Sequence, residues 1–178
     1  MDFLELVKLR KSCRKYSNRS LPHEILERCL EASRLAPSAC NSQPWNFIVI
    51  EDRGLKEKVG EAAFSGIYSV NSFAKKAPVL VAVIREKTSY LLKVGSFLRG
   101  TQYSLIDLGI TCEHFVLQAA QEGLGTCWLG FFNEKSVKKI LGIPKHKKVD
   151  ILISVGYPED NALIDKKRKA ISEICNFR

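Results

Sequence analysis

The sequence predicts one domain of the α+β class, or a three-layer α/β domain, from three observations. A long apolar stretch with helical spacing lies in the second half of the chain. Four short β-branched runs are typical of strands, and roughly five or six segments have helical patterns. The strands do not alternate regularly with single helices, so a doubly wound nucleotide fold is not favoured. The 178 residues contain no linker, repeat or low-complexity block, which suits a single domain over 1–178.

The stretch 102–126 predicts a long central helix around which the other elements pack. Apolar residues recur at the three-and-four spacing of an amphipathic helix, and Ile106, Ile110 and Leu117 add apolar side chains on its other faces. A helix that is apolar nearly all round is buried on nearly all sides. We therefore expect this helix to be shared between the core and a dimer interface. A core helix of a monomer is the alternative.

The N-terminal half predicts two helices, a polar loop and a strand. Asp2 and Glu5 have the spacing of a capping box at a helix start. A second helix begins near Pro22, where proline is tolerated, and stops at Pro37. The expected segments that complete this half are a polar elbow at 10–15, a proline-bounded loop at 37–45 and a strand at 47–50.

The second half predicts three strands and several short helices around the central helix. The apolar run 78–84 suits a strand buried in the middle of a sheet. Asn133 has the character of a helix N-cap, and Gly142 that of a helix end. The other expected elements are two short helices in 54–76 around Gly66, a short helix at 89–98, strands at 126–131 and 149–155, and a tail with a basic run at 166–169.

Composition bounds the class of protein. The longest continuous apolar run, 78–84, is far shorter than a membrane span, and the N-terminus lacks the apolar core of a signal peptide. We therefore expect a cytoplasmic protein that does not enter a membrane. The net charge of +9 attracts polyanions, so a nucleic-acid binder is a possible alternative class. No helix-turn-helix, zinc or RNA-binding pattern supports that class, and it is not favoured.

No residue pattern predicts a metal site or a protein-borne catalyst. The six cysteines include no CxxC pair and are interpreted as small buried hydrophobes in a reducing compartment. His114 is interpreted as a satisfied core or interface histidine. Gly123 and Gly125 follow a helix and open a strand, the reverse of a dinucleotide fingerprint. No catalytic side chain is expected, so catalysis would need a cofactor to supply the chemistry.

Two polar segments are candidates for cofactor binding. Arg10, Ser12 and Arg14 bring two guanidinium groups and a hydroxyl into one region, which suits a phosphate. The loop 37–43 carries hydroxyl and amide groups that suit the edge of a planar polar ring. The alternative interpretation of residues 10–14 is a solvated basic elbow. The alternative interpretation of the loop 37–43 is a simple connection.

Four segments of the chain, in their order, resemble the FMN-dependent nitroreductase family. They are RKSCRKY at 10–16, APSACNSQPWNF at 36–47, DLGITCEHFVLQAAQEGLGTCWLG at 107–130 and the basic tail at 166–169. This resemblance implies a nitroreductase-like α+β fold of three layers, α/β/α, with a central, mostly antiparallel sheet flanked by helices. It also implies an intertwined homodimer with two FMN sites at its interface. The tail, from about 160 to 178, would reach the partner subunit.

The resemblance also implies three groups of FMN-binding positions. The phosphate and ribityl chain would be held by Arg10, Lys11, Ser12 and Arg14, with charge added from the tail by Lys166 and Arg168. The isoalloxazine ring would be approached from the other subunit by Pro37, Ser38, Asn41 and Gln43. Its reactive side would be lined by backbone groups near Trp128, Leu129 and Gly130, where an amide can donate to N5.

The activity implied by the resemblance is a two-step hydride exchange. NADH or NADPH would reduce FMN, and a small-molecule acceptor such as a nitroaromatic or a quinone would then take its place. Reductive dehalogenation or another flavin reduction is the alternative on the same fold. Two residues depart from the family pattern: Lys11 stands where arginine is commoner, and Cys40 lies in a loop that is usually rich in Ser or Thr. We interpret Cys40 as inert, because no histidine or second cysteine lies beside it in sequence.

Overall fold

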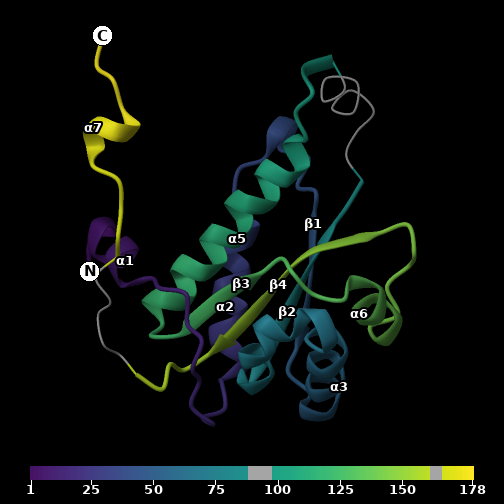
Figure 1. Ribbon diagram of the computed structural model, residues 1–178. Helices are drawn as coiled ribbons and strands as arrows, with labels where there is room; N and C mark the ends of the chain where they lie inside the picture. The colour runs from purple at the N-terminus through teal and green to yellow at the C-terminus, as the bar shows by residue number, and fades with distance from the viewer. Residues whose placement is uncertain (88–97, 161–165) are drawn as a thin grey trace.

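The computed structural model describes residues 1–87, 98–160 and 166–178 and contains one four-stranded sheet between two helical layers (Figure 1). The strands are β1 (Trp45–Ile50), β2 (Val79–Arg85), β3 (Gly125–Leu129) and β4 (Lys148–Gly156). They lie in the order β1-β2-β4-β3, and each neighbouring pair is antiparallel. The expected three-layer fold with a mostly antiparallel sheet is confirmed.

The two N-terminal helices begin where their sequence signals predict. Helix α1 (Phe3–Leu9) has a complete capping box, with Glu5 N 2.8 Å from Asp2 Oδ1 and Asp2 N 2.9 Å from Glu5 Oε2. Helix α2 (His23–Arg34) follows Pro22, which occupies the N-cap position. Proline is tolerated there because helix-start amides have no partner within the helix.

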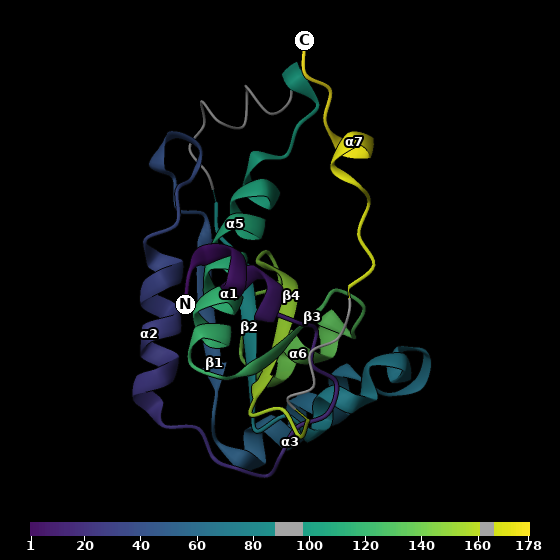
Figure 2. The ribbon, with the colours of Figure 1, turned by 90° about the vertical axis from the view of Figure 1, so that its left-hand side faces the viewer.

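The first helical layer consists of α2 and α5 (Tyr103–Gln121) packed on one face of the sheet (Figure 2). Alternate residues of β2, namely Val79, Val81 and Val83, point into this core. Phe115 of α5 is fully buried there. Burial raises the pKa of Cys112 on the same helix to about 12, as expected for a thiol that acts as a small hydrophobe.

The second layer covers the opposite face with α3 (Arg53–Ala63), the 3₁₀ segment η2 (Gly66–Lys76) and α6 (Glu134–Ile140). Leu80, Ala82 and Ile84 of β2 pack into this second core. Because both faces of β2 are covered, its apolar run is continuous rather than alternating. Gly66 has φ +58° at the break between α3 and η2, and Asn133 caps α6 through Oδ1, 3.1 Å from Ser136 N. Both helix signals are confirmed.

Helix α5 is buried mainly on one side within the single chain. One side, including Asp107, Leu108 and Phe115, is buried in the chain's own core. Ile106 on another side is 52% exposed. A groove between α1 and α5 includes Ile110 and Leu117 among its lining residues. Phe3 and Leu6 of α1 line the same groove, so α1 covers part of this side of α5 and leaves Ile106 uncovered within the described part of the chain.

The remaining described elements are the 3₁₀ turn η1 (Ala39–Asn41), before β1, and the short helix α7 (Ile171–Ile174) in the tail. The yellow tail stands away from the sheet in both ribbon views (Figures 1 and 2). The predicted helix at 89–98 lies almost entirely outside the described residues.

Candidate functional site

The elbow after α1 is fixed against the start of β3. Cys13 N donates to the carbonyl oxygen of Thr126 at 2.8 Å, and Ser12 forms a parallel bridge with Thr126. Cys13 is buried, whereas its neighbours Ser12 and Arg14 are exposed. A Cβ at Gly125 would lie 2.6 Å from Cys13 Sγ, so only glycine permits this close approach. The hydroxyl and guanidinium therefore face outward from a rigid support.

Positive charge gathers along this elbow. The Arg14 guanidinium lies over the Phe73 ring, 5.8 Å from its centroid. Burial raises the pKa of the Cys127 thiol, and the charges of Arg14 and Arg10 oppose that rise. Both guanidinium groups are thus close enough to β3 to act on one of its side chains. Lys11 Nζ donates to the carbonyl oxygen of Asp160 at 3.0 Å, which ties the elbow to the end of the described segment after β4.

The tail adds two more cations to the elbow, but one of them is engaged by backbone. Lys166 Nζ lies 2.9 Å from the carbonyl oxygen of Val7 and 2.6 Å from that of Lys8, and it also contacts the carbonyl oxygen of Arg10. Arg168 is exposed. Burial lowers the pKa of Lys166, and the charges of Arg10 and Arg168 lower it further. Lys166 is thus fixed at the end of α1 by backbone, and the charges of Arg10 and Arg168 both act on it.

The outer edge of β3 offers backbone donors beside the elbow. β3 pairs with β4 on one edge only, and the Thr126 carbonyl points away from β4 toward Cys13. Because backbone groups alternate in direction along a strand, those of Trp128 point outward as well. Gly130 follows the end of the strand, and a Cβ placed there would meet no atom within 4 Å. Leu129 is 2% exposed, so it supports the strand from the core side.

The loop 37–43 is held in an unusual backbone conformation. Cys40, Asn41 and Gln43 have φ values of 50°, 51° and 43°, in the left-handed region that favours glycine. Gln43 N donates to Ser38 Oγ at 2.9 Å, and Gln43 Nε2 lies 3.1 Å from Asn41 Oδ1. The polar residues Ser38, Asn41 and Gln43 of this loop are therefore hydrogen-bonded within the loop, through both side chains and backbone. Strain of this kind often occurs at functional sites.

The loop and the elbow lie at opposite ends of α5 (Figure 1). Ala39 N donates to Asp107 Oδ1 at 3.0 Å, near the start of the helix. Thr126, which holds the elbow, follows the end of the helix. At 1.5 Å per residue, the helix between Asp107 and Gln121 spans roughly 20 Å. One chain therefore does not bring Pro37, Ser38, Asn41 and Gln43 together with Arg10, Lys11, Ser12 and Arg14.

Segment η2 forms a wall next to the β3 edge, made of individual residues that no sequence motif singled out. Asn71 Nδ2 donates to the carbonyl oxygen of Phe131 at 2.9 Å. The Tyr68 ring packs on the Phe131 ring with centroids 4.8 Å apart. Phe73 of the same segment lies under Arg14. No sequence motif marks these residues. The structure identifies them because they contact Arg14 of the elbow and Phe131, which follows β3.

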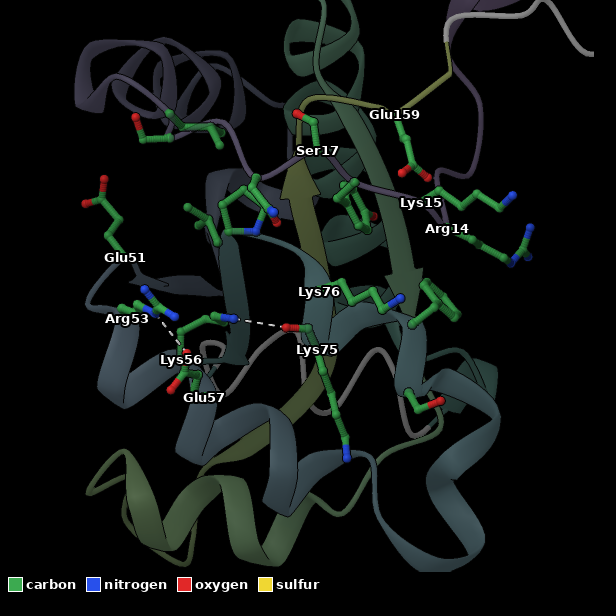
Figure 3. A pocket seen from close by; sticks show the side chains of 18 residues that line it. Arg14, Lys15, Ser17, Glu51, Arg53, Lys56, Glu57, Lys75, Lys76 and Glu159 are labelled. Atoms are coloured by element: carbon green, nitrogen blue, oxygen red, sulfur yellow. Dashed lines mark hydrogen bonds and ion pairs between the residues drawn. The ribbon is translucent and has the colours of Figure 1, made fainter.

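A polar cleft of about 1380 Å³ opens beside the elbow, between the segment 14–21, α3 and η2 (Figure 3). Several of its cations already have partners: Arg53 pairs with Glu57, Lys75 pairs with Glu61, and Lys56 Nζ donates to the Lys75 carbonyl oxygen. Its charged lining comprises Arg14, Lys15, Arg53, Lys56, Lys75, Lys76, Glu51, Glu57 and Glu159. The cleft extends the positive surface of the elbow rather than forming an enclosed pocket.

The described residues contain no group of three or more His, Cys, Asp or Glu placed to hold a metal ion. His114 Nδ1 lies 3.1 Å from the carbonyl oxygen of Ala32, so its ring links α5 to α2. Among the helices in the described ranges, none is long and apolar enough to cross a membrane.

A model of the Nitroreductase family matches residues 7–72 and 68–157, nearly the whole chain. The chain belongs to the Nitroreductase family. This membership confirms the resemblance drawn from the sequence and makes the protein an oxidoreductase.

Relatives and solved structures agree with this family. A protein of Methanothermobacter thermautotrophicus with the provisional name NADH dehydrogenase/NAD(P)H nitroreductase is 32% identical over 165 residues, covering 90% of this chain and 80% of its own. Mouse iodotyrosine deiodinase 1 is 26% identical over 97% of this chain and 68% of its own. An FMN-dependent nitroreductase from Clostridium difficile R20291 superimposes with a TM-score of 0.71, at 26% identity over 96% of this chain and 94% of its own.

Proposed function

We propose that this member of the Nitroreductase family is an FMN-dependent enzyme that uses NADH or NADPH to reduce nitroaromatic, quinone or similar small acceptors. The observation that carries the proposal is the rigid basic elbow beside the outward-facing backbone of β3. Ser12 and Arg14 are exposed there, next to an edge strand that ends at the open space around Gly130. The names of the relatives, which include NAD(P)H nitroreductase and FMN-dependent nitroreductase, support the same activity.

The chemistry of these donors fits FMN. A phosphate dianion suits two guanidinium groups and a hydroxyl, and the charges of Arg10 and Arg14 both act on Cys127 of β3. The open surroundings of Gly130 leave room for a planar ring against the strand edge. When bound, FMN would accept a hydride from NADH or NADPH and deliver it to the acceptor.

The chain's own part in the reaction is binding, orientation and electrostatics. Arg10, Ser12 and Arg14 would hold the phosphate, while outward backbone groups near Trp128 and Gly130 would fix one edge of the ring. The positive elbow would also stabilise negative charge gained on reduction.

We also propose that the site is completed by a second copy of the chain. The elbow and the loop 37–43 lie on the order of 20 Å apart in one chain, at opposite ends of α5, so the loop would serve a flavin that is held by the elbow of the other copy. Apolar side chains on α1, α5 and the tail are exposed, among them Phe3, Ile106 and Phe177. An intertwined homodimer would cover them, with residues from about 160 to 178 reaching the partner. The six free cysteines support the further proposal of a reducing, cytoplasmic location.

Reductive dehalogenation is the second candidate function. It is favoured by the similarity to iodotyrosine deiodinase 1 across 97% of this chain. Both activities would use the same flavin and the same basic elbow. A panel of nitroaromatics, quinones and halogenated phenols, assayed under identical anaerobic conditions, would separate them by the relative kcat/KM values.

The decisive experiment is a visible absorption spectrum of the purified protein, before and after anaerobic NADH or NADPH. We expect a flavin spectrum that bleaches when the nicotinamide is added. Free FMN with each nicotinamide, without protein, provides the control for direct reduction. A colourless protein that also fails to take up added FMN would contradict the proposal and return attention to nucleic acid as a ligand of the basic surface.

A further inference from the structure

We propose that Lys166 is a positioning residue that clasps the tail to the end of α1 and thereby sets Arg10 and Arg168 around the flavin phosphate. This inference rests on the proposed FMN function for its consequence, but the clasp itself is a feature of the protein without ligand. It changes the role that the resemblance implied for Lys166, which was to add charge at the phosphate itself.

The N–H donors of the Lys166 ammonium are engaged by backbone carbonyl oxygens. Nζ contacts the carbonyl oxygens of Val7, Lys8 and Arg10, where α1 ends and the elbow begins. Carbonyl oxygens in the last turn of a helix have no partner inside it, and their dipoles favour a cation. An ammonium has three donors, so three carbonyls engage all of them. Lys166 would have to break this arrangement in order to donate to a phosphate.

The described tail has few other ties to the chain. Within residues 166–178, the other hydrogen bonds that the structure shows are local, such as Arg168 Nη1 to the Lys167 carbonyl oxygen. Ile171, Ile174 and Phe177 are 71%, 70% and 92% exposed, so apolar packing does not hold the tail within one chain. The Lys166 clasp is therefore the contact that decides where the tail begins.

The clasp also explains why three cations can share this region. The charges of Arg10 and Arg168 both act on Lys166, although like charges repel. The helix-end carbonyls stabilise the ammonium, which leaves the two guanidinium groups available for an anion. A phosphate beside Arg10 and Arg168 would relieve the remaining repulsion. Lys166 thus contributes to phosphate binding through the placement of other residues.

The discriminating variant is Lys166→Arg, compared with Lys166→Met and with Lys167→Met as the matched control. Arginine keeps the charge and binds phosphate at least as well as lysine, so it would preserve a direct phosphate contact. Its planar guanidinium spreads its donors over three nitrogens, so it cannot place them at three carbonyls from one point, as the Lys166 Nζ does. A clasp therefore predicts that Lys166→Arg behaves like Lys166→Met. Lys167 is exposed and adjacent, so its variant removes a charge without removing the clasp.

The experiment measures backbone hydrogen–deuterium exchange in the FMN-free proteins, together with the Kd for FMN. In both Lys166 variants we expect faster exchange at 7–12 and 166–175, unchanged protection of β2, and an FMN Kd raised about tenfold, as is common for residues that support a ligand site. Lys167→Met should match the wild type in both measurements. Fast exchange only at the tail, with 7–12 unchanged, would also contradict a clasp.

The two proposals fail in different ways. If Lys166→Arg binds FMN like the wild type, or if Lys166→Met weakens FMN binding without changing exchange in the FMN-free protein, Lys166 is a phosphate ligand and the clasp is wrong. If the wild type takes up no FMN, the proposed function is wrong. The exchange measurement then still decides whether Lys166 holds the tail.

Discussion

At the scale of single residues, the candidate site depends on side chains whose surroundings are already ordered. Arg14 is presented by an extended segment that is hydrogen-bonded to Thr126, and its guanidinium rests on Phe73. Little conformational entropy is then lost when an anion binds, which favours affinity. Cys40 and Gln43 lie in a backbone conformation that costs energy before any ligand arrives.

Replacing Arg14 with alanine should weaken FMN binding strongly, because it removes a charge-assisted contact worth about 1.5–3 kcal/mol. Riboflavin, which lacks the phosphate, should bind the variant and the wild type equally. Quenching of flavin fluorescence during titration measures both affinities. Arg53→Ala removes a comparable charge from α3 and serves as the control. Equal FMN affinity in Arg14→Ala would sink the phosphate assignment.

Replacing Cys40 with glycine should stabilise the protein, because its φ of 50° is strained for any residue with a Cβ. The expected gain is about 1 kcal/mol. Ala39→Gly is the matched control and should be destabilising, since Ala39 is not among the residues with positive φ. Thermal unfolding of the three proteins checks the order, and a lower Tm for Cys40→Gly would contradict the strain argument.

At the scale of elements, α5 sets the positions of the two candidate flavin-binding segments, the loop 37–43 and the elbow 10–15. Its beginning holds the loop 37–43 through Asp107, and the turn after its end leads into β3 and the elbow. Asp107 is 3% exposed, and within the described structure its Oδ2 has no hydrogen-bond partner. A buried carboxylate is costly, so its hydrogen bond to Ala39 N is important for the loop.

Asp107→Ala should loosen the loop and destabilise the fold by about 1 kcal/mol, because it leaves the half-buried Ala39 amide without its acceptor. Asp107→Asn keeps an acceptor for Ala39 N and should cost less. Urea unfolding gives the stabilities, and exchange of the Ala39 amide reports on the loop directly. Equal effects of the two substitutions would mean that this hydrogen bond does not hold the loop.

The ion pair between Arg28 of α2 and Glu122, just after α5, should make the free energy of unfolding depend on pH. Arg28 Nε and Nη2 lie 2.7 and 2.8 Å from the two carboxylate oxygens of Glu122, and these bonds lower the pKa of Glu122. A lowered folded-state pKa stabilises the protein above the unfolded value of about 4.3, and this contribution is lost as the pH falls through the folded pKa.

The difference in unfolding free energy between the wild type and Glu122→Gln should therefore be largest near neutral pH and vanish under acid conditions. Urea unfolding at several pH values between about 7 and 3 measures it. Glu31→Gln should give a smaller difference. Glu31 and its partner Arg34 lie on the same helix, so their ion pair does not link two elements of the fold. A difference that grows on acidification would contradict this linkage.

At the scale of the whole molecule, the exposed apolar side chains of α1, α5 and the tail support the proposed homodimer. We expect a mass of about twice 20.1 kDa in solution. Ile106→Glu should weaken the dimer and lower flavin occupancy with it. Ile67→Glu, at a more exposed position on η2, should do neither. Analytical ultracentrifugation and the flavin absorbance per chain test both points, and a monomer that binds FMN fully would contradict the shared site.

The sequence predicted most of this architecture because its signals are local. The capping box at Asp2, the break at Gly66 and the cap at Asn133 each depend on a few adjacent residues. The same reasoning could not show that Lys166 donates to helix-end carbonyls, because those partners lie far away in sequence. Nor could it find Asn71 and Tyr68, which have a role only through their contact with Phe131. The left-handed conformation at Cys40 also carries no signal, since cysteine does not favour it.

The length of α5 has a consequence for genetics. In the proposed homodimer each flavin would contact the elbow of one chain and the loop of the other. A chain damaged only at Arg14 and a chain damaged only at Asp107 would then combine into a mixed dimer with one undamaged site and one doubly damaged site. Two inactive variants produced in the same cell should thus restore part of each other's activity, although neither contains a whole site of its own.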